Sequence, residues 1–289
     1  DIFIRSATDP ILFLEFHRQF THALAFIPLG ALICAGVLHP FARKRLSFRE
    51  SYLFCFLGYA THGLLDACTT YGTQLLWPFS DMRVAWNNVS VVDPLFTLPA
   101  LVLIILASRW KQPRLARYAM AWAVAYLCLG VVQHERAEAV GRAVAHDRGH
   151  DPVRLDAKPG FANLLLWKVV YEVDDHYYVD AVRVGWDAKV YPGEHIQKFD
   201  LAVHVPWLDH QSQQARDVER FRWFSNDYLA MDEHNQIGDV RYSVLPNQIK
   251  PMWGILLDPN ANSDQHVKYF TGRREPSTDK LLDMLLGSH

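Results

Sequence analysis

The sequence lacks an excess of charge of either sign. Lysines and arginines nearly balance aspartates and glutamates, for a formal net charge of −2 at neutral pH, and no basic patch dominates. A protein that binds nucleic acid through its phosphates needs such a patch. Nucleic acid is therefore not expected as the main partner.

Cysteine is scarce, and short catalytic motifs are missing. The four cysteines lie in apolar stretches, and their spacing matches no zinc or disulfide framework, so we expect small buried side chains: Cys34, Cys55, Cys68 and Cys128. The sequence has no glycine-rich phosphate loop and no Gly-x-Ser-x-Gly nucleophile motif. Neither a P-loop enzyme nor a serine hydrolase with a nucleophile elbow is indicated.

Long apolar runs are present, but only in residues 11–132; residues 133–289 have the polar, charged and aromatic composition of a soluble domain. This contrast predicts a polytopic α-helical membrane domain over residues 1–150 and a soluble α+β domain over residues 151–289. Apolar stretches of bilayer length predict about four membrane spans: His22–Pro40, Tyr52–Trp77, Pro94–Ser108 and Tyr118–Val132, the last continuing as a helix beyond the membrane. Residues 1–21 are expected to form a short interfacial helix or loop.

Two short basic loops set the expected orientation of these spans. Residues 41–49 and 109–117 each carry four lysines or arginines, and such loops remain on the cytoplasmic side of a membrane. The second and fourth spans then end on the opposite side. We therefore expect a multi-pass protein of a bacterial inner membrane with its carboxy-terminal domain in the periplasm.

The soluble half shows strand-like runs separated by polar turns. Two of them flank Asp174–His176 and predict a hairpin, whereas residues 210–231 have the apolar spacing of a helix. These patterns predict a mostly antiparallel β domain. Within it, Asp239 and Arg241 are expected to form a structural pair in preference to a lipid head-group site.

His62 and Asp66 interrupt the second apolar stretch. Their spacing of four places both side chains on one helix face, and ionisable residues inside an apolar span commonly mark a site. Imidazole and carboxylate together suit a divalent metal such as zinc or manganese. The alternative is a hydrogen-bonded pair that holds two helices together, and spacing alone does not decide between them.

Other polar residues are expected at the same membrane face. His17, Arg18 and His22 precede the first span, and Asp93 begins the third. His134 and Glu135 follow the fourth span on that side. This clustering favours a metal site over an isolated pair.

One part of the sequence resembles a known family. The string THGLLDACTTYGTQLLWPFS (residues 61–80), with HRQFTH before it and DPLFTLP after it, is similar to the YdjM family of bacterial inner-membrane proteins, described as membrane-bound metal-dependent hydrolases. The positions that match the family's polar residues are Asp1, His17, Arg18, His22, His62, Asp66 and Asp93. Family members begin with a helix ending in Pro-Asp-Leu-Asp. Asp1 fits the last residue of that motif, so we expect the preceding helix to be missing here.

The resemblance implies a mechanism of metal-assisted hydrolysis. His17, His22, His62 and Asp66 would hold one or two divalent ions, zinc in the first place with manganese or magnesium as alternatives. Asp93 or Asp1 would serve as ligand or general base, and Arg18 would stabilise a developing oxyanion. A periplasm-facing site at the membrane boundary suits a membrane lipid or a lipid-linked phosphoester. The rival interpretation is a non-catalytic metal-binding scaffold or a transporter.

Overall fold

The computed structural model describes residues 4–272 and 278–287, and by its contacts the chain forms two compact units. Unit 1 comprises residues 1–6 and 12–87, and unit 2 comprises residues 7–11 and 88–289. This division differs from the compositional boundary expected at residue 150, because the long helix that carries the last apolar stretch continues into the β-rich part of unit 2. Each unit is described separately.

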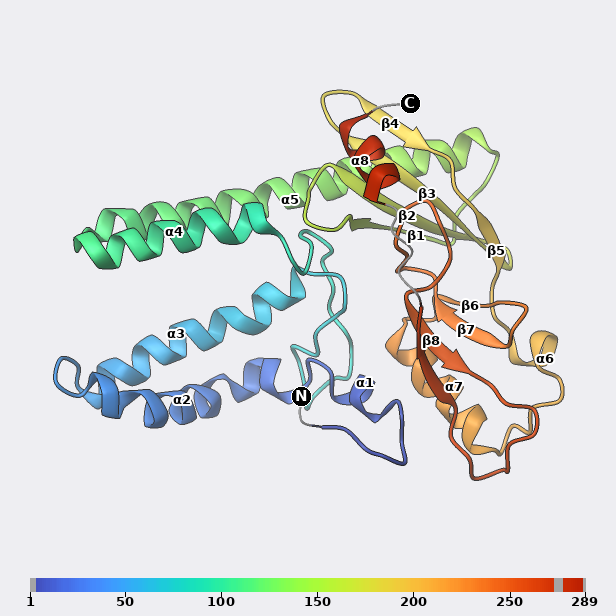
Figure 1. Cartoon of the computed structure of the whole chain (residues 1–289), viewed down its shortest axis with the longest axis horizontal. Coiled ribbons are helices and arrows are strands. Elements are labelled where there is room, and N and C mark those ends of the chain that lie inside the picture. Colours follow the sequence, from blue (N-terminus) through green and yellow to red (C-terminus); the bar gives the residue numbers. More distant parts are fainter. Residues whose placement is uncertain (1–3, 273–277, 288–289) are drawn as a thin grey trace. The chain divides into compact units, whose positions relative to one another are not determined.

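Unit 1 is a helical hairpin preceded by short turns (Figure 1). Helix α3 begins with a capping box, in which the Ser47 hydroxyl accepts from the Glu50 amide and the Glu50 carboxylate accepts from the Ser47 amide. The loop between α2 and α3 holds the first of the two basic clusters. The elements of this unit are α1 (Leu12–Phe16), η1 (Phe20–His22), η2 (Leu24–Phe26), α2 (Ile27–Ala42) and α3 (Phe48–Ala67).

Helix α3 ends ten residues before Trp77, where the sequence predicted the end of the second span. The carbonyl of Asp66 accepts hydrogen bonds from the Thr69 hydroxyl (2.7 Å), the Thr69 amide (3.1 Å) and Arg18 (3.1 Å). These donors satisfy a carbonyl that a continuing helix would use itself. The prediction of a helix through the whole apolar stretch is therefore wrong beyond Ala67.

Unit 2 combines a helical hairpin with two antiparallel sheets (Figure 1). Its helices are α4 (Pro94–Trp110), α5 (Pro113–Asp147), α6 (Leu201–His204), α7 (Gln213–Phe224) and α8 (Thr278–Leu286). The five-stranded sheet has the order β1-β2-β3-β4, with β5 also paired to β3: β1 (Arg154–Pro159), β2 (Leu166–Val173), β3 (His176–Val184), β4 (Ala188–Tyr191) and β5 (His195–Gln197). The four-stranded sheet has the order β6-β7-β8-β9: β6 (Leu229–Met231), β7 (Gln236–Asp239), β8 (Trp253–Leu256) and β9 (Lys268–Thr271).

The predictions for the soluble half are confirmed in outline. Strands β2 and β3 form the expected hairpin, with Val173 opposite His176, and α7 occupies the segment expected to be helical. An apolar cluster joins residues of the two sheets and of the segments beside the second sheet: Val170, Tyr177, Val179, Tyr228, Ala230, Val240 and Ile249.

The expected pair of Asp239 and Arg241 lies inside this β-rich part. The two side chains form a buried ion pair, with Arg241 donating to both carboxylate oxygens at 2.6–3.1 Å. Asp239 is fully buried and Arg241 nearly so, so the pair is structural, as predicted.

Within residues 4–272 and 278–287, two helical segments are long and apolar enough to cross a membrane: Leu24–Ala42 and Pro113–Asp147. The apolar helix α4 is shorter, with 17 residues. Helix α3 does not qualify, because Glu50, His62 and Asp66 lower its average hydropathy. Two of the four predicted spans thus have the required length and composition.

The cysteines differ in their exposure. All four carry free thiols. Cys128 is exposed and the others are half-buried. The expected burial is therefore wrong for Cys128, which lies in the apolar part of α5.

Candidate metal centre

The last turns of α3 place two candidate ligands together. His62 and Asp66 lie on one face of the helix, with His62 Nε2 4.0 Å from Asp66 Oδ2. Because the helix ends one residue after Asp66, this carboxylate lies beside the irregular segment that follows. The spacing predicted from the sequence is confirmed as a local geometry.

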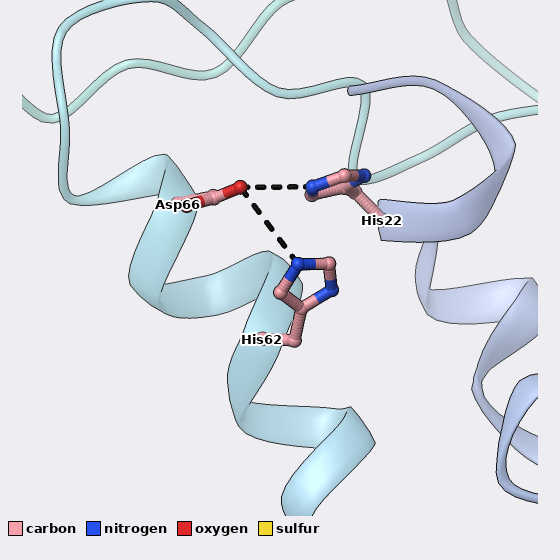
Figure 2. Close-up of side chains that lie close together, drawn as sticks. All are labelled: His22, His62 and Asp66. Carbon is pink, nitrogen blue, oxygen red and sulfur yellow. Dashed lines mark ion pairs between the residues drawn. The ribbon is translucent and has the colours of Figure 1, made fainter. Parts of the chain in front are cut away.

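His22 reaches the same carboxylate oxygen from the turn before α2. Its Nε2 is 2.8 Å from Asp66 Oδ2, and its ring centroid is 4.2 Å from that of His62. Figure 2 shows both imidazoles directed at this one oxygen atom. One ligand atom from each of the three residues lies within 4.8 Å of the others.

Gly63 makes this approach possible. A Cβ atom at position 63 would lie 2.3 Å from the carbonyl oxygen of His22, a distance that real Cβ atoms essentially never show. The backbone of η1 therefore packs directly against α3 where α3 has no side chain. A larger residue between His62 and Asp66 would displace His22 from the cluster.

Thr21 orients the His22 ring. Its hydroxyl oxygen is 2.9 Å from His22 Nδ1, which leaves Nε2 for Asp66. A hydrogen bond to the other ring nitrogen is how proteins fix a metal-binding histidine in one tautomer. The arrangement suits Nε2 as a ligand atom.

Arg18 contacts both the carboxylate and the backbone carbonyl of Asp66. Its Nε is 3.4 Å from Asp66 Oδ2, and its Nη1 donates to the Asp66 carbonyl and to the Thr69 hydroxyl. The side chain lies over Tyr71 and is 9% exposed. These contacts give Arg18 the surroundings of a positioning residue.

The remaining predicted site residues have other surroundings. The His17 ring packs edge-on against Tyr71, outside the group of three, and burial together with nearby Arg18 and Arg83 lowers the pKa of His17 to about 4. Asp93 belongs to unit 2. Asp1 lies outside the described residues.

Asp93 has a structural environment of its own. It caps α4, where Oδ1 accepts from the amides of Leu95 and Phe96, and its Oδ2 accepts from the Tyr126 hydroxyl at 2.8 Å. Both carboxylate oxygens therefore have partners within unit 2. This arrangement ties the start of α4 to α5.

The group of three fits a divalent metal ion by its donor chemistry. Two imidazole nitrogens and one carboxylate oxygen are a common ligand set for zinc, and catalytic zinc sites use three protein ligands with one position left open. The His62 side chain is 48% exposed, whereas those of His22 and Asp66 are 10% and 26% exposed. The open side of the cluster is therefore the side of His62.

Sequence reasoning missed the residues that support this cluster. Thr21 precedes His22, and Gly63 follows His62, but neither is recognisable until η1 and α3 are brought together. Thr69 was missed for the same reason, since its hydroxyl acts on a helix end that the sequence did not predict. The adjacent Thr-His and His-Gly pairs were the only signals.

Apolar side chains on the helices of both units are exposed to the surroundings, which water disfavours and lipid accepts. They include Leu29, Ile33, Val37, Phe54 and Leu57 in unit 1 and Leu98, Val102, Ile105, Val124 and Leu129 in unit 2. Together with two helices of spanning length, these faces are typical of a membrane protein. Residues 1–137 match the YdjM inner membrane protein family, the family that the sequence resembles.

Two relatives extend this comparison. The chain is 22% identical over 242 residues to the uncharacterized protein YfhP of Bacillus subtilis (strain 168), covering 80% of this chain and 70% of that protein. It is 35% identical over 79 residues to the inner membrane protein YbcI of Escherichia coli (strain K12), covering 26% of this chain and 44% of that protein. No solved structure shows significant similarity.

Proposed function

We propose that this protein is a membrane-bound metal-dependent hydrolase whose divalent ion is held by His22, His62 and Asp66. Zinc suits the ligand set best, and manganese or magnesium are alternatives. The observation that carries the proposal is the convergence of two imidazole nitrogens on one oxygen of Asp66. His22 belongs to η1 and His62 to α3, and the His62 side chain lies on the open side of the cluster.

The ion and the residues around it would have separate roles. A divalent ion bound there supplies Lewis-acid activation of water or of a substrate oxygen near neutral pH. Thr21 keeps Nε2 of His22 directed at the ligand position, and Arg18 fixes the carboxylate of Asp66. In this proposal Arg18 positions Asp66 and does not contact the substrate, because its guanidinium is buried among protein acceptors.

The proposed location of the site is the periplasmic membrane boundary. The basic loop of residues 43–49 lies at one end of the α2–α3 hairpin, and the His–Asp cluster lies at the other, because His22 precedes α2 and Asp66 ends α3. A helix of 16 residues spans about 24 Å. With basic loops on the cytoplasmic side, the cluster faces the periplasm in a multi-pass arrangement.

This location indicates the class of substrate. A site at the boundary between lipid and water, beside exposed apolar helix faces, suits a molecule with an apolar tail and a polar group to be cleaved. We therefore propose a membrane lipid or a lipid-linked phosphoester. The bond cleaved would lie at the head group, at the level of His62.

One observation favours a non-catalytic alternative. The His22–Asp66 contact of 2.8 Å, supported by Arg18, is also a geometry in which a charge pair holds two helices together without metal. A scaffold of this kind would need no ion. Metal content separates the two interpretations.

The test begins with the protein purified in detergent and its metal content measured by elemental analysis. His62→Ala and Asp66→Ala should each remove the ion assigned to this cluster. His39→Ala is the matched control, because His39 contacts Ser51 at the other end of the same hairpin. Unchanged metal content in both site variants would refute the proposed centre.

Catalysis is tested separately on the metal-loaded protein. Phospholipids and lipid-linked phosphoesters in mixed micelles should be hydrolysed by wild type and by His39→Ala, and not by Asp66→Ala. Metal loss in the variants without any turnover in wild type would instead support the scaffold.

A further inference from the structure

A second group of possible ligands lies in unit 2. It comprises His134 and Glu138 on α5 and Asp156 on β1, and one ligand atom from each lies within 4.8 Å of the others. His134 and Glu138 are four residues apart and share a helix face. Glu135, which follows His134 in the sequence, is exposed.

Close packing brings α5 to the five-stranded sheet. Ala137, Gly141 and Ala145 are buried at four-residue intervals along the helix. A Cβ atom at position 141 would lie 2.6 Å from Cγ1 of Val169 and 3.3 Å from Cδ1 of Leu155. Small side chains on this face therefore let α5 lie against β1 and β2, which carries His134 and Glu138 to Asp156.

The His134 ring has a buried nitrogen that is not hydrogen-bonded. Its Nε2 is inaccessible to solvent and has no hydrogen-bond partner among the described residues, and the ring lies against Trp167. Buried polar atoms are rarely left without a hydrogen bond, because burial removes the hydrogen bonds that water would supply. An unsatisfied imidazole nitrogen close to two carboxylates is the arrangement expected of an incomplete ligand shell.

The distances fit a metal ion better than a direct hydrogen bond. His134 Nε2 and Glu138 Oε1 are 3.4 Å apart, and two ligands of a tetrahedral zinc ion are roughly this far apart when their bonds are about 2.0–2.1 Å long. Hydrogen bonds from nitrogen to a carboxylate are shorter, about 2.7–2.9 Å. The pair is thus spaced for an atom between its members.

Two neighbouring cations contact the carboxylates of this group. Arg142 donates to Oε2 of Glu138, so that Oε1 remains directed at His134. The Arg142 side chain is 55% exposed, and such a surface pair contributes little. Lys158 donates to Oδ2 of Asp156 at 2.8 Å.

We propose that His134, Glu138 and Asp156 bind one divalent transition-metal ion, zinc or manganese, as a second site independent of the His22 cluster. One nitrogen and two carboxylate oxygens are ligands that both ions accept. Bound there, the ion links α5, the longest apolar helix, to the edge strand β1 of the sheet. Its role is to fasten the end of the membrane helix to the β-rich part of unit 2.

The experiment uses the full chain in detergent with the first cluster disabled by His62→Ala and Asp66→Ala. After treatment with EDTA, this parent is dialysed against micromolar Zn²⁺ or Mn²⁺, and bound metal and thermal unfolding are measured. We expect one ion per chain and a higher unfolding temperature with metal. His134→Gln, Glu138→Gln and Asp156→Asn, each added to the parent, should lose the ion and the thermal shift.

Glu135→Gln is the matched control, because it removes an exposed carboxylate on the same turn of α5 and should keep both. A parent that binds no ion would overturn the proposal, as would a parent whose ion persists in all three ligand variants. If one variant fails to fold, the other two decide. The parent lacks the first cluster, so failure of the proposed hydrolase centre does not affect the result.

Discussion

Gly63→Ala tests whether the close contact of η1 with α3 assembles the His22–His62–Asp66 cluster. The added methyl group would lie 2.3 Å from the His22 carbonyl oxygen, whereas real Cβ contacts do not fall below 3.0 Å. The backbone at His22 must therefore move by at least 3.0 − 2.3 = 0.7 Å. Metal–ligand distances tolerate only about 0.2 Å.

The expected effect on metal binding follows from this displacement. His22 can no longer share an ion with His62 and Asp66 without strain, so we expect the affinity to fall at least about tenfold, or about 1.4 kcal/mol. Crowding a packed contact typically destabilises by about 1–3 kcal/mol, and replacing glycine by alanine in a helix returns up to about 1 kcal/mol. The net loss of stability should be about 0–2 kcal/mol.

Gly58→Ala provides the control on the same helix, because a Cβ atom at position 58 meets nothing within 4 Å. It should bind metal like wild type and be as stable or more stable. The assays are competition with a chromophoric zinc chelator and thermal unfolding by circular dichroism, both in detergent. If Gly63→Ala matches Gly58→Ala in both, the reasoning about η1 and α3 is wrong.

Three further predictions concern other contacts. Thr21→Val should weaken zinc binding about 10–100-fold, because it removes the partner of His22 Nδ1; chelator competition measures it, and an unchanged affinity would refute the role of Thr21. Asp239→Asn should destabilise the protein by about 3–5 kcal/mol, because it leaves Arg241 charged and buried without its counterion; a denaturation midpoint equal to that of wild type would contradict this. Burial lowers the pKa of Lys168 to about 7. The unfolded chain then binds more protons than the folded one above that pH, and stability should rise between pH 7 and 9. Lys168→Met should remove that part of the rise, and parallel pH profiles for the two proteins would refute the assignment.

The sequence determined the classes of structure in each part of the chain. Apolar runs of bilayer length predicted α2 and the apolar part of α5. A helix satisfies its own backbone hydrogen bonds, and an apolar run places no polar side chain in lipid. Alternating apolar residues around a polar turn gave the β2–β3 hairpin, and the pairing of Asp239 with Arg241 followed from their place in that β domain. The spacing of His62 and Asp66 fixed their relation, since it depends only on helix geometry.

Only the tertiary structure shows where α3 ends. The apolar pattern of the sequence continues past Ala67 to Trp77. The stop depends on Arg18, nearly fifty residues earlier in the chain, and on the Thr69 hydroxyl, which together occupy the carbonyl of Asp66. A contact between distant segments is not encoded in the periodicity of either one.

Packing likewise decided which residues belong to each of the two candidate metal sites. His17 and His22 are both histidines shortly before α2, and the sequence does not distinguish them. Only His22 lies where Gly63, which has no side chain, lets the backbone of η1 approach α3; His17 packs on Tyr71. Similarly, Glu135 is next to His134 in sequence, yet Glu138 shares its helix face and meets Asp156. The sequence supplied the ligand types, and the close approach of backbones through glycine decided which of them meet.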